Sequence, residues 1–283
     1  MQDGRCKRGA LRSYAAMLER LRDPFGFGRP GFERHAKDFG DLPRLDGLRV
    51  LITGASGGLG QATRSACDAL GATTFDASRS SGWDLTDPAR VGALAEELGE
   101  VDVLVHNAGV LPTAYQETAE GLELALALNL VATHRLTRAL PAKKVIWVSS
   151  GGGLTQSLEV EPMFSPPKPY DGVVQYARTK RAEIVLAKLW ARERPNSCFS
   201  AMHPGWADTP GVSSSLPTFH KLTKGVLRTP EQGADTIVWL CGAQVETGKF
   251  WFDRSQADAL PLPGVRSAAA DEAALWARLE SLL

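Results

Sequence analysis

The sequence predicts an α/β protein of the doubly wound, or Rossmann, type, in which a parallel sheet carries helices on both faces. Short apolar runs at residues 50–52, 72–75, 101–105, 145–148, 198–202 and 250–252 alternate with stretches of helical periodicity. Fully apolar runs of this length are typical of strands that are buried on both faces. A glycine-rich turn follows the first run directly. A strand, a tight turn and a helix in this order are typical of the start of such a fold.

Composition is consistent with one globular α/β domain. The chain has 283 residues, of which 43% are hydrophobic, so it can bury a large core. Lys plus Arg equals Asp plus Glu at 32 each, so we expect no nucleic acid partner. The four cysteines are scattered without metal or disulfide spacing, and no run is long enough to cross a bilayer. We therefore expect a soluble, cytoplasmic protein without a metal site.

Residues 1–46 form an N-terminal extension to a catalytic domain that we expect over residues 47–283. Five apolar residues at helical spacing predict an amphipathic helix within it: Leu11, Tyr14, Ala15, Leu18 and Leu21. Four aromatic residues follow in a segment that is too glycine-rich for regular structure: Phe25, Phe27, Phe32 and Phe39. We interpret the extension as an arm docked on the main domain. Contact with a membrane surface, or a wall of the substrate pocket, are the alternatives.

The turn at residues 53–60 is the first candidate binding element. Gly54, Gly58 and Gly60 let the backbone turn sharply and approach a pyrophosphate, whose charge the N–H groups of the next helix would face. Alone this is a weak signal, because many connections between strands and helices use glycine. The sequence therefore predicts a dinucleotide site that the rest of the chain must support.

The connection after the second strand is unusually short. Only residues 80–83 separate Arg79, at the end of that strand, from Asp84. A parallel crossover usually needs a dozen or more residues. We therefore expect no helix there, a third strand reduced to a short piece at residues 83–85, and a trimmed sheet edge.

The residues that indicate chemistry are Ser150, Tyr176 and Lys180. Tyr176 and Lys180 are four residues apart and so share one helix face. A phenol ionises near pH 10, and making it a base near neutrality costs roughly 4 kcal/mol, which a neighbouring ammonium can supply. Ser150 follows a strand and could hold a substrate oxygen beside the phenol. Singly, these residues are equally consistent with a surface pair and a turn cap.

Two further features fit the same edge of the sheet. Asn107, Ala108 and Gly109 follow the strand at residues 101–105 directly. Asn129 lies among leucines in the helix expected over residues 122–140, where a buried amide needs hydrogen-bond partners.

Taken together, these motifs resemble the short-chain dehydrogenase/reductase (SDR) family between residues 48 and 253. The resemblance implies a catalytic tetrad in which Tyr176 is the acid/base, Lys180 assists it and binds the ribose, Ser150 orients substrate and Asn129 holds a water. It also implies a set of cofactor-binding residues: Gly54, Ser56, Gly57, Gly58, Leu59, Gly60, Ser78, Arg79, Asp84, Leu85, Asn107, Ala108, Gly109, Tyr176, Lys180, Pro204, Gly205, Trp206 and Thr209.

The expected cofactor is NADP(H) rather than NAD(H). Family members that prefer NAD place an acidic residue at the end of the second strand, where this chain has Ser78 and Arg79. A guanidinium suits a 2′-phosphate. Asp76 lies two residues earlier and should not reach the ribose, although a register error would reverse this preference.

The expected reaction interconverts a carbonyl and an alcohol on a lipophilic small molecule. The apolar residues expected to wall the substrate pocket are Leu154, Met163, Phe164, Pro166, Pro167, Tyr170, Leu216, Phe219 and Leu222. His203 and His220 are interpreted as structural residues with satisfied hydrogen bonds. The alternative function is an NADP(H)-binding scaffold or redox sensor with little turnover. Helices at residues 122–140 and 179–194 are apolar on more than one face, which a homo-oligomer or the N-terminal arm could cover.

Overall fold

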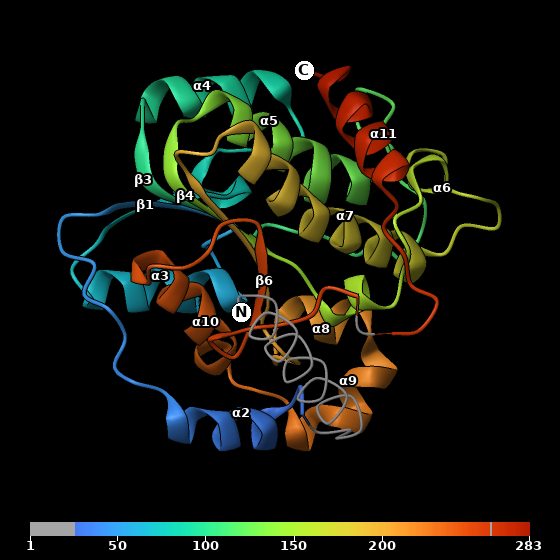
Figure 1. Ribbon diagram of the computed structural model, residues 1–283. Helices are drawn as coiled ribbons and strands as arrows, with labels where there is room; N and C mark the ends of the chain where they lie inside the picture. The colour runs from blue at the N-terminus through green and yellow to red at the C-terminus, as the bar shows by residue number, and fades with distance from the viewer. Residues whose placement is uncertain (1–25, 261) are drawn as a thin grey trace, which may run out of the picture.

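The computed structural model describes residues 26–260 and 262–283, and a seven-stranded sheet forms its centre (Figure 1). The strands are β1 (Arg49–Thr53), β2 (Thr73–Ala77), β3 (Val101–His106), β4 (Ala142–Val148), β5 (Cys198–His203), β6 (Lys249–Phe252) and β7 (Ser255–Gln256). Their order across the sheet is β2-β1-β3-β4-β5-β6-β7, and all neighbouring strands are parallel except β6 and β7. The predicted doubly wound fold is confirmed, and each predicted apolar run overlaps one of the parallel strands.

Helices cover both faces of the sheet (Figure 1). One face carries α4 (Pro88–Leu98), α5 (Ala132–Ala139) and α7 (Gly172–Glu193), and the other carries α3 (Gly58–Ala69) and α10 (Pro230–Gly242). Successive residues of β1 alternate between the two cores: Leu51 joins the first, and Val50 and Ile52 join the second. The carboxyl ends of the parallel strands therefore converge on one edge of the sheet, where the glycine turn lies.

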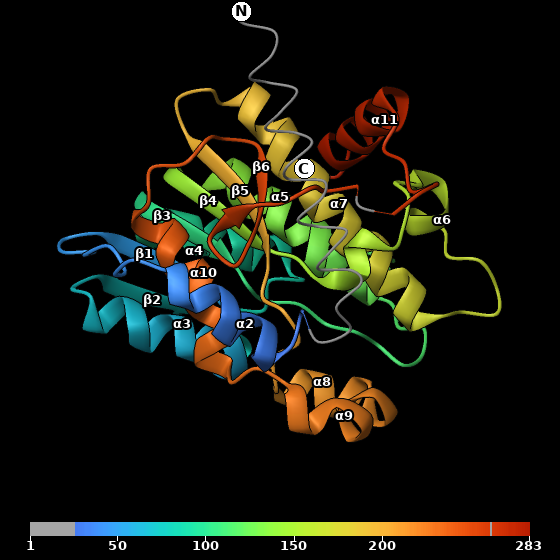
Figure 2. The same cartoon turned by 60° about the horizontal axis from the view of Figure 1, so that its bottom comes forward.

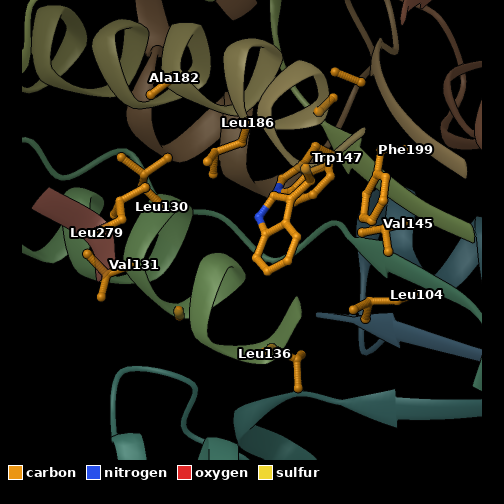
Figure 3. Packing of buried hydrophobic residues seen from close by; sticks show 14 of the residues in the cluster. Leu104, Leu130, Val131, Leu136, Val145, Trp147, Ala182, Leu186, Phe199 and Leu279 are labelled. Atoms are coloured by element: carbon orange, nitrogen blue, oxygen red, sulfur yellow. The ribbon is translucent and has the colours of Figure 1, made fainter. Parts of the chain in front are cut away.

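The C-terminal helix α11 (Ala269–Glu280) covers the outer face of α7 (Figures 1 and 2). Leu275 and Leu279 are buried in the same hydrophobic cluster as Leu186 of α7 and Trp147 of β4 (Figure 3). The Arg181 guanidinium donates to the carbonyl of Ala259. The second apolar face of α7, which the sequence left open to a partner subunit or to the N-terminal arm, is thus covered by the end of the same chain.

The edge of the sheet beside β2 is trimmed, as expected, but the short third strand is absent. The described structure has the 3₁₀ turn η2 (Arg79–Ser81) and no strand at residues 83–85. Ser78 closes this turn, because Ser81 Oγ accepts from the Ser78 N–H at 3.0 Å and the Ser78 carbonyl accepts from Trp83 N at 2.9 Å. These local bonds occupy the backbone groups that a strand would need, and β2 becomes the outer strand.

Two predicted helix boundaries were wrong. α7 begins at Gly172, seven residues before the predicted start, because the Asp171 carboxylate accepts from the N–H groups of Val173 and Val174 and caps the helix there. The helix expected over residues 122–140 begins after the bridge at Glu123 and contains a π-helical turn, η3 (Leu126–Val131), before α5. Asn129 lies inside this turn, and such insertions are frequent at functional sites.

The described part of the N-terminal extension is more regular than predicted. Residues 29–35 form helix α2 (Arg29–His35), which has Pro30 at its first turn and is followed by η1 (Ala36–Asp38). α2 lies outside α10 (Figure 2). The amphipathic helix predicted between Leu11 and Leu21 lies outside the described residues. Within the described ranges, none of the helices combines the length and the apolar character needed to cross a bilayer.

The remaining elements are short and lie near the carboxyl edge of the sheet or beside α7. They are η4 (Gly151–Leu154), α6 (Val160–Phe164), α8 (Pro210–Ser215), α9 (Pro217–Thr223) and η5 (Lys224–Val226).

Candidate active site

Two adjoining cavities of about 620 and 610 Å³ open at the carboxyl edge of the sheet. The first is bounded by the glycine turn, the segment after β2 and the segment after β3. The second is bounded by the ends of β4 and β5, the first turns of α7 and the α8–α9 region. Leu59, Asn107, Gly109, Val110 and Thr209 line both cavities, so the two are direct neighbours.

Hydrogen bonds and close packing fix the backbone conformation of the glycine turn. Gly54 has a φ of 66° and Gly58 a φ of 53°, which is the left-handed region where glycine carries no steric penalty. The Asn107 side-chain amide donates to the carbonyls of Thr53 at 2.9 Å and Gly54 at 3.2 Å. A Cβ on Gly60 would lie 2.6 Å from Asn107 Nδ2 and would also meet the Gly54 carbonyl. The inner side of the turn is therefore closely packed, and Gly54, Gly57 and Gly58 line the first cavity.

The acidic residue near the end of β2, Asp76, is hydrogen-bonded within the protein. The Asp76 carboxylate accepts from Ala55 N at 3.0 Å and from Ser78 Oγ at 2.8 Å, so it supports the glycine turn. Arg79 is exposed on η2 and lines the first cavity. Hydrogen bonds from Thr86 lower the pKa of Asp84. The cavity wall at this end thus presents the Arg79 guanidinium, serine hydroxyls and the Asp84 carboxylate.

Ser150 lies at the carboxyl end of β4 and begins η4. Its hydroxyl accepts from Gly152 N at 3.3 Å and lines the second cavity. The neighbouring Ser149 is buried, and its hydroxyl donates to the Lys180 carbonyl at 2.7 Å. This bond ties the end of β4 to the helix that carries Tyr176.

Tyr176 and Lys180 share one face of α7, as predicted, and both line the second cavity. The Lys180 ammonium lies 5.6 Å from the centroid of the Tyr176 ring. It donates to the Val148 carbonyl at 3.0 Å and to Glu183 Oε1 at 2.7 Å. Burial is the largest single influence and lowers the pKa of Lys180, but attraction to Glu183 and Tyr176, together with the hydrogen bond to Glu183, raises the pKa overall. Lys180 is therefore a buried, permanent cation beside the phenol at neutral pH.

Asn129 is fully buried and lines neither cavity. Its Oδ1 accepts from Val110 N at 2.8 Å, and its Nδ2 donates to the Val110 carbonyl at 3.1 Å and to Thr179 Oγ1 at 3.0 Å. The side chain thus joins the segment after β3 to α7. These three hydrogen bonds use most of the donors and acceptors of the Asn129 side-chain amide.

The segment at residues 204–209 is attached to the N-terminal arm. Gly205 has a φ of 76°, and a Cβ on it would lie 2.6 Å from Arg228 Cδ. Arg228 is buried and bonded twice to Asp253, at 2.6 and 2.9 Å. Trp206 N donates to the Phe27 carbonyl at 2.7 Å. The arm therefore holds the back of a loop whose front borders the second cavity.

The walls of the second cavity differ from the prediction. Leu216 and Phe219 line it, together with Leu111, Val174 and Trp206. Six of the other seven predicted wall residues do not: Leu154, Met163, Phe164, Pro166, Pro167 and Tyr170. Leu154 and Met163 are buried in the hydrophobic core instead. Leu222 is also absent from the wall and is 80% exposed.

The interpretation of His203 as a satisfied histidine was wrong. Both ring nitrogens are buried without a hydrogen-bond partner in the described part of the chain, and the ring stacks on Phe252. Burial, with a smaller contribution from the nearby Arg228 charge, lowers the pKa of His203 to about 3. His220 does have a partner, Asp208, at 2.8 Å.

The structure brings almost all the predicted site residues to the two cavities. Those on the first cavity are Gly54, Ser56, Gly57, Gly58, Leu59, Ser78, Arg79, Asp84, Leu85, Asn107, Ala108, Gly109 and Thr209. Those on the second, apart from shared ones, are Ser150, Tyr176, Lys180, Pro204, Gly205 and Trp206. Gly60 and Asn129 lie behind the walls. Sequence reasoning missed Glu183, although its spacing of three from Lys180 was a usable signal.

Comparison with known proteins agrees with this geometry. Residues 50–239 match the model of the NAD dependent epimerase/dehydratase family. The chain is 35% identical over 296 residues to human dehydrogenase/reductase SDR family member 12, covering 90% of this chain and 93% of that protein. It is 27% identical over 277 residues to mouse retinol dehydrogenase 14, covering 78% of this chain and 82% of that protein.

Solved structures share the fold. A short chain dehydrogenase from Burkholderia cenocepacia J2315 in complex with NADP has a TM-score of 0.55 at 21% identity, covering 71% of this chain and 92% of that one. A short-chain type dehydrogenase/reductase from Mycobacterium marinum has a TM-score of 0.56 at 24% identity, covering 71% and 91%. From its relatives, its sheet and the motifs at its carboxyl edge, the chain belongs to the short-chain dehydrogenase/reductase family of oxidoreductases.

Proposed function

We propose that the protein is an NADP(H)-dependent oxidoreductase that interconverts a carbonyl and an alcohol on a lipophilic small molecule. The observation that carries this proposal is that the two cavities share wall residues: the glycine turn lines the first, and Ser150, Tyr176 and Lys180 line the second beside it. One cavity suits a dinucleotide and the other suits a substrate beside it.

The residues present fit a nicotinamide dinucleotide. The open side of the glycine turn suits the pyrophosphate, Arg79 and Ser78 suit a 2′-phosphate, and Lys180 suits the ribose next to the nicotinamide. Such a cofactor, when bound, supplies or accepts the hydride.

In the proposed mechanism Ser150 donates a hydrogen bond to the substrate oxygen and holds it beside the Tyr176 hydroxyl. Tyr176 gives a proton to that oxygen during carbonyl reduction and takes it back during alcohol oxidation. The Lys180 ammonium lies 5.6 Å from the centroid of the Tyr176 ring. A cation beside a phenol favours the phenolate that forms during proton exchange.

Asn129 is proposed to position the site. Its bonds to Val110 and Thr179 join the segment after β3 to α7, the helix that carries Tyr176 and Lys180. The water that the family resemblance assigns to Asn129 stays part of the proposal.

The preference for NADP(H) rests on the end of β2. The Asp76 carboxylate accepts from Ala55 N and Ser78 Oγ, and Arg79 is the cationic residue that lines the first cavity directly after β2. A carboxylate held in this way is not available to ribose hydroxyls, whereas an exposed guanidinium can pair with a phosphate.

The lipophilic substrate class rests on the second cavity, whose described walls include Leu111, Val174, Leu216 and Phe219. The relative named retinol dehydrogenase 14 is consistent with an elongated apolar alcohol or aldehyde. Retinoid-like and steroid-like carbonyls are therefore the first candidates.

The test follows absorbance of the reduced nicotinamide while NADPH is incubated with aldehydes, ketones, and retinoid- and steroid-like carbonyls. Oxidation of NADPH with an apolar carbonyl is the expected result. Tight NADPH binding without oxidation across the panel would favour the alternative, a dinucleotide-binding scaffold or redox sensor.

The proposed location is the cytoplasm. Cys67, Cys198 and Cys241 are free thiols, which agrees with a reducing compartment of this kind.

We retain the proposed domain boundary near residue 46, with the extension as a docked arm, because Phe27 contacts His203 and Trp206. Liposome co-sedimentation with and without residues 1–22 tests membrane contact, and mass in solution tests a homo-oligomer.

A further inference from the structure

Glu183 is a buried carboxylic acid that the proposed mechanism does not use. Its side chain is 2% exposed, and its Oε1 accepts from the Lys180 ammonium at 2.7 Å. Its Oε2 is buried and has no hydrogen-bond partner in the described part of the chain. An ionised carboxylate in such a place is costly unless a nearby charge offsets it, and Lys180 is the charge in contact with it.

Glu183, Lys180 and Tyr176 lie along one stripe of α7. The separations of three and four residues bring each side chain next to the following one, so Lys180 lies between the phenol and the carboxylate. An ammonium has three N–H donors. The bonds to Glu183 and to the Val148 carbonyl use two of them, and these bonds fix the Nζ so that the third can serve the cavity that Lys180 lines.

Few other titratable groups face this stripe. From β3, the buried His106 faces Lys180, and its pKa is lowered to about 3 by burial and then by the Lys180 charge, so His106 is neutral at working pH. From η3 and β4 the neighbours are the uncharged Asn129 and Ser149. Burial raises the pKa of Glu183 to about 7 although Lys180 opposes this rise. The charge on the Lys180–Glu183 pair therefore changes near neutrality through Glu183.

We propose that Glu183 is a positioning residue that anchors the Lys180 ammonium and, by gaining or losing its own charge, sets the pH range in which Tyr176 exchanges a proton. This inference rests on the proposed function and adds a regulating group to the same site. When Glu183 is ionised, its negative charge offsets that of Lys180 and the phenolate is less stable. When Glu183 is protonated, the full ammonium charge acts on Tyr176.

The decisive variant is Glu183→Gln, which keeps an oxygen acceptor for Lys180 but has no charge. Seven helical residues separate Glu183 from Tyr176 by about 10 Å, and a unit charge at that distance shifts an ionisation midpoint by about one pH unit. We expect the pH midpoint of Tyr176 ionisation to fall by about that amount, because the opposing negative charge is gone. The pH profile of kcat/KM for alcohol oxidation should move in the same direction.

The readout that does not need turnover is ultraviolet absorbance of tyrosinate. The chain has four tyrosines, so subtracting the titration of Tyr176→Phe isolates one residue. The matched control is Glu272→Gln. Glu272 is a buried carboxylate of α11 that pairs with Lys188 of α7 at 2.7 Å and lines neither cavity. This control should leave the Tyr176 midpoint unchanged. Glu183→Asp keeps the charge and should retain the wild-type midpoint.

An unchanged Tyr176 midpoint in folded Glu183→Gln overturns the proposal, as does an equal shift in Glu272→Gln. Should Glu183→Gln not fold, carbon-13 NMR of the Tyr176 ring in the wild-type protein replaces it: the resonance should show an extra inflection near pH 7, and a single inflection overturns the proposal. Turnover that survives Tyr176→Phe would refute the proposed function instead, while the titration would still decide the role of Glu183.

Discussion

Asn107 lies so close to Gly60 that a single methyl group on the glycine would be 2.6 Å from the asparagine Nδ2. Asn107 belongs to the segment after β3, and Gly60 belongs to the first turn of α3. The Asn107 amide, which also donates to the carbonyls of Thr53 and Gly54, therefore packs the segment after β3 against the glycine turn. The identity of residue 60 affects the whole turn, although Gly60 faces neither cavity.

Gly60→Ala should lower both the free energy of unfolding, by about 1–3 kcal/mol, and the affinity for NADPH, because the turn must open to admit the methyl group. Denaturant unfolding and fluorescence titration with NADPH measure the two effects. The control is Gly92→Ala in α4, where a Cβ meets no atom within 4 Å and helix propensity improves. A Gly60→Ala protein as stable as the wild type would show that the turn is looser than described.

Tyr176→Phe should reduce kcat by about 10²- to 10⁴-fold and leave the dissociation constant for NADPH within about threefold. The ring remains to pack against Lys180, and the proton donor is lost. Tyr115→Phe is the control, because Tyr115 is 48% exposed and its hydroxyl donates to Glu117 outside both cavities. If Tyr176→Phe instead loses cofactor binding, the tyrosine has a structural role.

Arg79→Ala should weaken NADPH binding by about tenfold or more and change NADH binding little, because a charge-assisted bond to the 2′-phosphate is lost. Isothermal titration with both cofactors checks this. Arg64→Ala serves as the control, since Arg64 is a half-exposed arginine of α3 that lines neither cavity. A wild-type protein that binds NADH tenfold tighter than NADPH would contradict the cofactor preference.

Asp253→Asn should destabilise the protein by about 3–5 kcal/mol, because it leaves the Arg228 guanidinium buried without its counter-charge. Both side chains of this pair are 1% exposed, and Asp253 also contacts His35 at 2.6 Å. Asparagine tolerates the left-handed backbone at this position, where φ is 48°, so the change tests charge rather than strain. Glu246→Gln, which breaks the exposed pair with Lys249, should cost less than about 1 kcal/mol.

Stability should fall as the pH drops below about 6.5. Burial lowers the pKa of His106 and of His203 to about 3, which is below the ordinary value of 6.5. At these two histidines the unfolded chain therefore binds more protons than the folded one between these values, and the stability that they contribute above pH 6.5 is lost towards pH 3. Each histidine contributes up to about 1.4 kcal/mol per pH unit.

Unfolding by denaturant at several pH values between 7 and 5 measures this slope. His203→Phe, which keeps an aromatic ring against Phe252, should reduce the slope by the share of one histidine. An unchanged slope would mean that His203 is not the source of the pH dependence.

Local patterns predicted the parts of the site that lie on one element. Tyr176 and Lys180 share a helix face because that depends only on their spacing. Gly54 and Gly58 form the turn because the backbone there needs positive φ. The sheet could be predicted because each parallel strand is an apolar run.

Features that depend on tertiary packing could not be predicted in this way. Leu154 and Met163 were expected in the substrate pocket, but η4 and α6 turn them into the core. The burial of Glu183 depends on how α7 meets β3 and β4, and the missing partners of His203 depend on the neighbours of β5. The start of α7 depended on one side chain, Asp171, whose capping role was not recognised.

The outer side of β2 pairs with no strand in the described structure, and residues 78–86 form the cavity wall beyond it. Two exposed residues of this segment, Arg79 and Ser80, can therefore be exchanged without disturbing any ladder between strands. Under the proposed function, a library confined to these two positions would vary the coenzyme requirement, while Ser78 keeps its bond to Asp76 and Leu85 keeps its packing in the scaffold.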